Sequence, residues 1–137
     1  MEILDITLLI MRLMIGSFFI VHGYSKFVDT KDIAKWLEKY GYKPPMLWVS
    51  LIIISELVGG IGVVLGLGTR LFALMMSVVM LQGIHHRRHI KELKFVDGWE
   101  INYVTLASTI ALILLGSGSI SLDSLLGIQN SLYGFFP

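Results

Sequence analysis

The chain has 137 residues, of which 55% are apolar and 15% charged, with a mean hydropathy of +0.75 and a net charge of +1. Soluble domains carry about 25% charged residues, so this composition excludes a soluble domain and indicates one membrane domain covering residues 1–137. The basic residues fall in short loops, where lipid headgroups rather than nucleic acid account for them, and the absence of cysteine excludes disulfides and thiolate metal sites.

Four apolar stretches, each bounded by polar or turn-forming residues, predict an all-α fold, an integral membrane four-helix bundle. They cover about residues 4–21, 46–67, 71–89 and 99–115. Acidic Glu2 and Asp5 stand where a cleavable signal would be basic, so we expect the first span to remain in the protein.

The loop after the first span predicts a helix of its own, with Asp29 or Thr30 suited to cap it and Gly41 suited to end it. Apolar residues share one face and lysines line another. The apolar face holds Ile33, Trp36, Leu37 and Tyr40, and the basic face holds Lys31, Lys35 and Lys39. This pattern indicates an amphipathic interfacial helix anchored in the headgroup region by Trp36 and Tyr40.

The basic residues also predict the orientation of the chain. Nine lie in the two long loops or at their borders, and the turn between the second and third spans holds only Arg70. The nine are Lys26, Lys31, Lys35, Lys39, Lys43, Arg87, Arg88, Lys91 and Lys94. By the positive-inside rule we expect a multi-pass protein of the plasma membrane, with cytoplasmic long loops and external termini.

Two charged residues lie within apolar spans, Arg12 near the middle of the first and Glu56 near the middle of the second. A charge at the centre of a span costs about 2.5–3.5 kcal/mol on insertion scales, so each needs a partner. Antiparallel neighbours would place the two at one depth, which predicts an Arg12–Glu56 pair. Such a pair either fixes helix register or marks a ligand or proton site, and both alternatives stay open.

Small residues in the second span predict close helix packing. Ser55, Gly59, Gly62 and Gly66 share one face, and Gly16 and Gly23 make the first span the expected partner. After the fourth span, Gly116 and Gly118 indicate a turn, and Ser121 or Asp123 is suited to cap a short final helix.

Polar residues, several of them titratable, gather where three spans meet the cytoplasmic loops. They are His22, Lys26, Gln82, His85, His86, His89, Glu100, Asn102 and Tyr103. His85 and His89 have metal-ligand spacing, but Arg87 and Arg88 between them disfavour a cation, so we expect no metal or haem. A histidine beside Glu100 suits proton exchange near neutral pH, whereas headgroup contact is expected for His86, Arg87, Arg88 and Lys94.

Short motifs in this order resemble the DoxX family. They are Arg-Leu-x-x-Gly at 12–16, His-Gly-x-x-Lys at 22–26, Glu56 with the glycines through Gly66 to Arg70, and Glu100 followed by Gly-Ser-Gly-Ser-Ile-Ser-Leu-Asp at 116–123. The resemblance implies a four-helix membrane protein associated with redox assemblies. One branch, DoxD, is the large subunit of a thiosulfate:quinone oxidoreductase; this chain is shorter than that type and lacks cysteine.

We therefore expect a membrane-embedded subunit of a quinone-linked redox complex, with quinone as cofactor and other membrane or peripheral redox subunits as partners beside the lipid bilayer. The expected proton-handling residues are Glu56, His22 and Glu100, and the expected quinone-binding residues are Arg12, His22, Lys26, His85 and Asn102. A non-catalytic assembly subunit is the main alternative. A small transporter is a third, although four short spans leave little room for alternating access.

Overall fold

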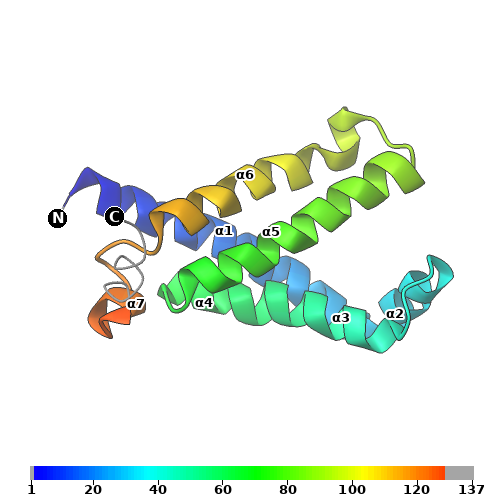
Figure 1. The fold of residues 1–137 in the computed structure, drawn as a ribbon, viewed down its shortest axis with the longest axis horizontal. Coiled ribbons are helices and arrows are strands. Elements are labelled where there is room, and N and C mark those ends of the chain that lie inside the picture. The colour runs from blue at the N-terminus through cyan, green and yellow to red at the C-terminus, as the bar shows by residue number, and fades with distance from the viewer. Residues whose placement is uncertain (1, 129–137) are drawn as a thin grey trace.

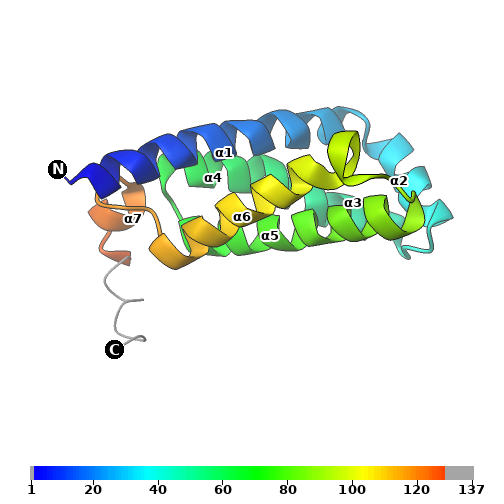
Figure 2. The same ribbon diagram turned by 90° about the horizontal axis from the view of Figure 1, so that it is seen from above.

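The computed structural model describes residues 2–128, which are helical with no strand (Figure 1). Antiparallel rods lie side by side in the views of Figures 1 and 2. They are α1 (Ile3–Val28), a composite rod of α3 (Pro45–Ile53), the π-helical turn η1 (Ile54–Val58) and α4 (Gly59–Leu65), then α5 (Thr69–His85) and α6 (Glu100–Leu115). The predicted all-helical bundle is confirmed for these residues.

Within residues 2–128, three helical stretches are long and apolar enough to cross a membrane. They are Ile3–Val28, Pro45–Leu65 and Phe95–Leu115. The fourth rod, α5, has 17 residues and packs along both α4 and α6 (Figure 2). The protein therefore has several membrane-spanning helices, and α5 lies within the same bundle.

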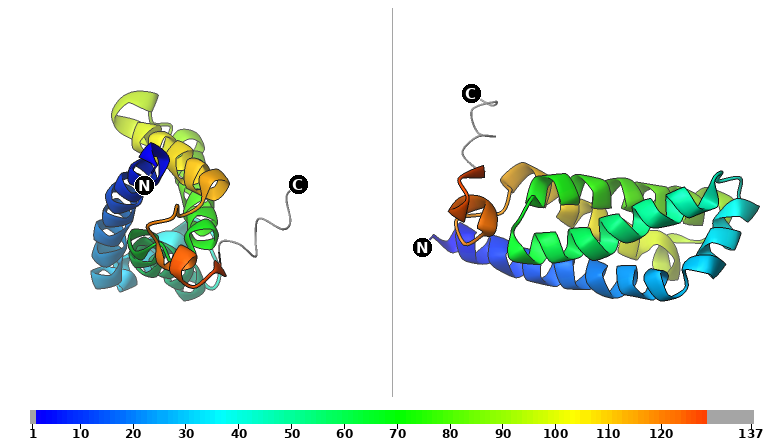
Figure 3. Two further views of the ribbon diagram at one scale, coloured as in Figure 1. Left: turned by 90° about the vertical axis from the view of Figure 1, so that its left-hand side faces the viewer. Right: turned by 90° about the horizontal axis from the view of Figure 1, so that it is seen from below.

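The connecting segments divide between the two ends of the bundle (Figures 2 and 3). One end holds the two long loops, with α2 (Thr30–Lys39), η2 (His86–Ile90) and the irregular turn η3 (Phe95–Trp99). The other end holds the N-terminus, the α4–α5 turn and α7 (Leu122–Leu125). Both basic loops thus share one end, as the charge pattern requires, while the side of the membrane that this end faces stays a prediction.

The first helix is longer than the apolar stretch from which it was predicted, because α1 continues to Val28 rather than ending near residue 21. His22 and Lys26 consequently lie inside α1 and not beyond its end. Gly23 is accommodated within the helix because its Cα faces the backbone of the composite rod, and a Cβ there would lie 2.5 Å from the Leu57 nitrogen. The close approach of the two backbones explains this glycine.

The prediction that α1 packs closely on the second span through Gly16 and Gly23 is confirmed. The face of α4 predicted to meet α1 is wrong. Gly60, rather than Gly59 or Gly62, meets Gly16, and a Cβ on Gly60 would lie 2.9 Å from the Gly16 carbonyl oxygen. Gly59 and Gly62 instead face Phe72 of α5. The glycine-rich segment therefore packs closely on two neighbours, α1 on one face and α5 on the other.

A small apolar cluster of Ala34, Leu37 and Val49 packs α2 on α3, and the larger apolar core occupies the half of the bundle nearest the α4–α5 turn. Its buried members are Leu8, Phe19, Val63, Ala73, Met76, Met80 and Leu112. Beyond this core, α5 continues to pack on η1 but diverges from α3, as Figure 1 shows. The bundle therefore opens toward the end that carries α2.

Candidate functional site: a buried ion pair beside a cavity

A cavity of about 560 Å³ occupies the open end of the bundle. This volume is within the range of small-molecule sites, about 300–1,000 Å³. The walls come from α1, α2, α3, η1, α5, η2 and α6, and most are apolar. The lining includes Phe18, His22, Lys26, Trp36, Leu37, Trp48, Leu51, Ser55, Glu56, Met75, Val78, Met80, Gln82, His86, Ile101 and Asn102.

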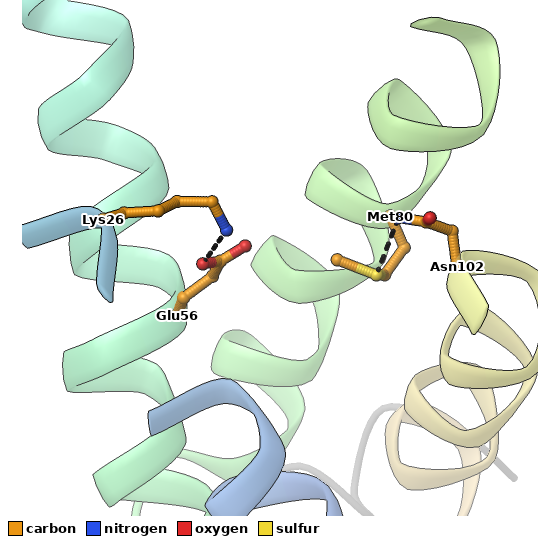
Figure 4. Close-up of polar contacts among 4 residues, drawn as sticks. All are labelled: Lys26, Glu56, Met80 and Asn102. Carbon is orange, nitrogen blue, oxygen red and sulfur yellow. Dashed lines mark hydrogen bonds and ion pairs between the residues drawn. The ribbon is translucent and has the colours of Figure 1, made fainter. Parts of the chain in front are cut away.

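An ion pair forms one wall of the cavity, with Lys26 Nζ donating to Glu56 Oε2 (Figure 4). The Glu56 side chain is 1% exposed, whereas that of Lys26 is 31% exposed. Gly23 packs against the backbone at Glu56, so Lys26 lies about 4.5 Å farther along α1, and its long stem reaches back to the carboxylate. Glu56 therefore keeps a cationic partner within the apolar bundle.

Glu56 lies in the π-helical turn η1, and Ser55 beside it is also buried. A π-helical turn inserts an extra residue into the hydrogen-bonded ring and is frequent at functional sites. Ser55 therefore departs from the four-residue spacing that would place it above Gly59 in a regular α-helix. The turn places both polar side chains in the cavity wall.

Three buried polar atoms of the cavity wall have no hydrogen-bond partner among residues 2–128. They are Ser55 Oγ, His86 Nε2 and Asn102 Oδ1. Most buried polar atoms in proteins are hydrogen-bonded, and leaving one unpaired costs about 1–3 kcal/mol. Their convergence on one cavity is the arrangement expected for a site that binds a partly polar molecule.

Asn102 lies across the cavity from the ion pair, as Figure 4 shows. Its amide nitrogen donates to Met80 Sδ at 3.5 Å, which leaves the amide oxygen free to accept. Gly83 of α5 provides the space for this side chain, since a Cβ at Gly83 would lie 2.5 Å from the Asn102 nitrogen. The α5–α6 contact therefore holds the Asn102 amide in the cavity wall.

Helix α2 covers the loop end of the cavity and contacts His86. The ring centroids of Trp36 and Tyr40 lie 4.5 Å and 4.7 Å from that of His86, which is 6% exposed. The expectation of headgroup contact for His86 is thus wrong, because the histidine is enclosed by α2. Trp36 and Tyr40 likewise turn rings toward the bundle, and Leu37 is buried there.

Four of the predicted site residues meet at this cavity: His22, Lys26, Glu56 and Asn102. His22 is exposed at its edge, where its ring lies 4.3 Å from that of Phe18. Their roles in catalysis or binding stay predictions, but the structure brings them together from three rods.

The three other predicted site residues, Arg12, His85 and Glu100, lie outside the cavity lining. His85 is exposed, and its ring lies 5.2 Å from that of His89. Glu100 accepts a hydrogen bond from the backbone nitrogen of Asp97 at 3.1 Å, which ties the first residue of α6 to the η3 turn before it. No group of three or more potential metal-ligating side chains occurs within residues 2–128.

The predicted Arg12–Glu56 pair is wrong, because Arg12 lies toward the opposite end of the bundle. Arg12 is 1% exposed, and its guanidinium donates to the carbonyl oxygen of Ile120. Since Gly16 packs on Gly60 and Gly23 on Leu57, the register of the two rods places Arg12 near Gly66. The depth estimate failed because α1 extends seven residues beyond the apolar stretch that defined its midpoint.

Arg12 belongs instead to a structural clasp formed by Arg12, Gly66, Ile120 and Asp123. The Asp123 carboxylate accepts from the nitrogens of Gly68 and Thr69 at 2.8 Å and 3.1 Å, and so caps α5. The Asp123 nitrogen donates to the Gly66 oxygen at 2.8 Å. Ser121, as predicted, caps α7 by accepting from the Ser124 nitrogen at 3.1 Å.

Comparison with known proteins matches the DoxX family model to residues 7–85, more than half of the chain. The chain belongs to the DoxX family. It is also 30% identical over 119 residues to a Bacillus subtilis (strain 168) protein named "Putative oxidoreductase CatD", covering 87% of this chain and 86% of that protein. No solved structure matches. The family and the apolar helices make this DoxX protein a multi-pass membrane protein in contact with lipid.

Proposed function

We propose that this DoxX protein is a membrane-embedded subunit of a redox complex and binds a quinone in the cavity beside Lys26 and Glu56. The observation that carries the proposal is the convergence of Ser55, His86 and Asn102, each with an unpartnered buried polar atom, on one apolar cavity. A quinone has an apolar ring system with polar oxygens at its edge, which suits walls of this composition.

The donors around the cavity have distinct roles in this proposal. Lys26 and His22 would donate hydrogen bonds to the oxygens of the ring, and Ser55 would orient it from the π-helical turn. When bound, the quinone would supply reversible two-electron redox chemistry. Glu56, held by Lys26, and His22 at the exposed edge would hold and exchange the protons that accompany it.

Electrons would come from a partner subunit that carries a redox centre, because this cysteine-free chain offers no thiolate ligands. The naming of the Bacillus subtilis relative as an oxidoreductase supports a redox role. The long loops, which we expect on the cytoplasmic side of the plasma membrane, would then be the face nearest a peripheral donor. The alternative assembly subunit would share the family and the fold without binding quinone.

Quinone binding is testable by tryptophan fluorescence, since Trp36 and Trp48 line the cavity and Trp99 does not. In a Trp99→Phe background, purified with its native partners in mild detergent, we expect a quinone analogue to quench emission saturably. Glu56→Gln and Ser55→Ala should each raise the Kd by about fivefold or more, which corresponds to about 1 kcal/mol. Ser55→Ala should leave stability intact, because its Oγ has no partner among the described residues.

Glu100→Gln is the matched control, because Glu100 lies outside the cavity lining and should leave the Kd unchanged. Absence of saturable quenching in the complex, with native partners still copurifying, would overturn the quinone proposal and leave the assembly subunit.

A further inference from the structure

Among the apolar residues of the cavity wall that also face out of the bundle, Leu51 and Val78 lie on facing rods, α3 and α5. Leu51 of α3 is 44% exposed, and Val78 of α5 is 59% exposed. A side chain that is exposed and also lines a cavity lies at its rim. Leu51 and Val78 therefore mark an opening between α3 and α5, the two rods that diverge beyond η1 (Figure 1). We call this rim the α3–α5 opening.

The surroundings of the α3–α5 opening are mostly apolar, and the exposed Gln82, one turn beyond Val78 on α5, is the polar side chain at its loop side. Trp48, 42% exposed, and Met75 extend the same wall on either side. The α3 side belongs to Pro45–Leu65, a stretch long and apolar enough to span a membrane. The opening therefore faces lipid acyl chains rather than water, and a molecule using it must be soluble in the bilayer.

The other sides of the cavity are less suited to an apolar chain. At the loop end, Leu37 is 4% exposed and α2 is held by the contacts of Trp36 and Tyr40 with His86. Between α1 and α6 the exposed rim residues are His22 and Ile101. Because His22 is polar, this side of the cavity suits an apolar chain less well than the α3–α5 opening.

Ser55 and Leu51 lie about one turn apart on the same rod, which links the polar interior of the cavity to its apolar rim. A molecule with a polar ring at Ser55 and Glu56 would direct an attached chain past Leu51. We infer that the ligand is a tailed, membrane-dissolved quinone that enters sideways through the α3–α5 opening and leaves its tail there. This inference rests on the proposed quinone site and adds its substrate class and direction of entry.

Reversible blocking of the rim tests the inference, because the chain has no cysteine and a single introduced one is uniquely reactive. Leu51→Cys and Val78→Cys, in lipid nanodiscs, are each modified with a bulky methanethiosulfonate reagent. The rate of tryptophan quenching is then measured after a tailed quinone is added to the bilayer. We expect modification to slow the rate of quenching at least about fivefold. Cleaving the label with a reductant, and then removing the reductant, should restore the original rate.

Matched controls come from lipid-facing residues of the same type and exposure that lie outside the cavity lining: Leu13, 44% exposed, and Val104, 59% exposed. Labels at Leu13→Cys and Val104→Cys should leave the rate unchanged. Equal rates in rim and control variants would overturn the inference, as would slowing by a label at Ile101→Cys but not at Leu51→Cys or Val78→Cys. Absence of saturable quenching in unmodified protein would instead overturn the quinone site itself, and the entry route with it.

Discussion

Lys26 donates a hydrogen bond to the buried Glu56 carboxylate, so the cation that stabilises this acid comes from the loop end of α1 rather than from its middle. Arg12, the other charge within α1, lies in the clasp at the far end. The two cations of α1 therefore stabilise different parts of the molecule, and substitutions at Lys26 and Arg12 should have independent effects.

A double-mutant cycle on Lys26 and Glu56 tests this pairing. Lys26→Met strands the buried carboxylate and should cost about 3 kcal/mol, the lower end of the range for buried pairs because Lys26 is 31% exposed. Combining it with Glu56→Gln should recover part of the loss. Stability is measured by thermal denaturation in detergent. The control cycle, Arg12→Met with Glu56→Gln, should be additive, and additivity in the Lys26 cycle would contradict the pairing.

Gly66→Ala should be severely destabilising. Gly66 has a φ of +69°, and a Cβ there would overlap the Nη1 atom of buried Arg12. Gly41 is the matched control, since its φ is +87° and nothing lies within 4 Å of a Cβ at that position. Gly41→Ala should lower stability only by the free energy of placing a Cβ-bearing residue in the left-handed region, about 1 kcal/mol. Equal losses of thermal stability in the two variants would show that Arg12 is not held at Gly66.

His86→Ala should loosen α2. The variant removes the ring that contacts both Trp36 and Tyr40, and each aromatic contact is worth about 0.5–1.5 kcal/mol. Hydrogen exchange across residues 30–40 should accelerate in His86→Ala and stay unchanged in His85→Ala, whose side chain is exposed. Slow exchange of α2 in both variants would mean that His86 does not hold the helix in place.

The predicted orientation is testable in intact cells with an impermeant maleimide, because the chain has no cysteine of its own. Lys35 and Ser119 are exposed at opposite ends of the bundle. With cytoplasmic long loops, Ser119→Cys should react from outside and Lys35→Cys only after permeabilisation. The reverse labelling pattern would invert the topology.

The sequence was sufficient to predict the rods, the shared end of the two long loops and the packing of Gly16 and Gly23, because these depend on apolar length and small-residue spacing. It also named His22, Lys26, Glu56 and Asn102, which the fold brings to one cavity. Each was recognisable as a polar residue within or beside an apolar span.

Features that depend on register and tertiary contact were not predictable in the same way. The partner of Arg12 is a backbone carbonyl 108 positions later, for which no local pattern exists. The π-helical turn at Glu56 shows no distinct signal in apolar periodicity, so Ser55 was interpreted only as a packing residue. His86 resembled its exposed basic neighbours, and its burial follows from the position of α2 across the bundle end.

The most direct test of the central claim is photolabelling with a quinone that carries a photoreactive group on its ring, followed by peptide mapping by mass spectrometry. The quinone site predicts labels within the cavity wall, on α3–η1 and α5 near Ser55 and Val79, which excess unlabelled quinone removes. Ser55→Ala should reduce them. Labels spread over lipid-facing positions such as Leu13 and Val104, unchanged by competitor, would contradict a quinone site in this cavity.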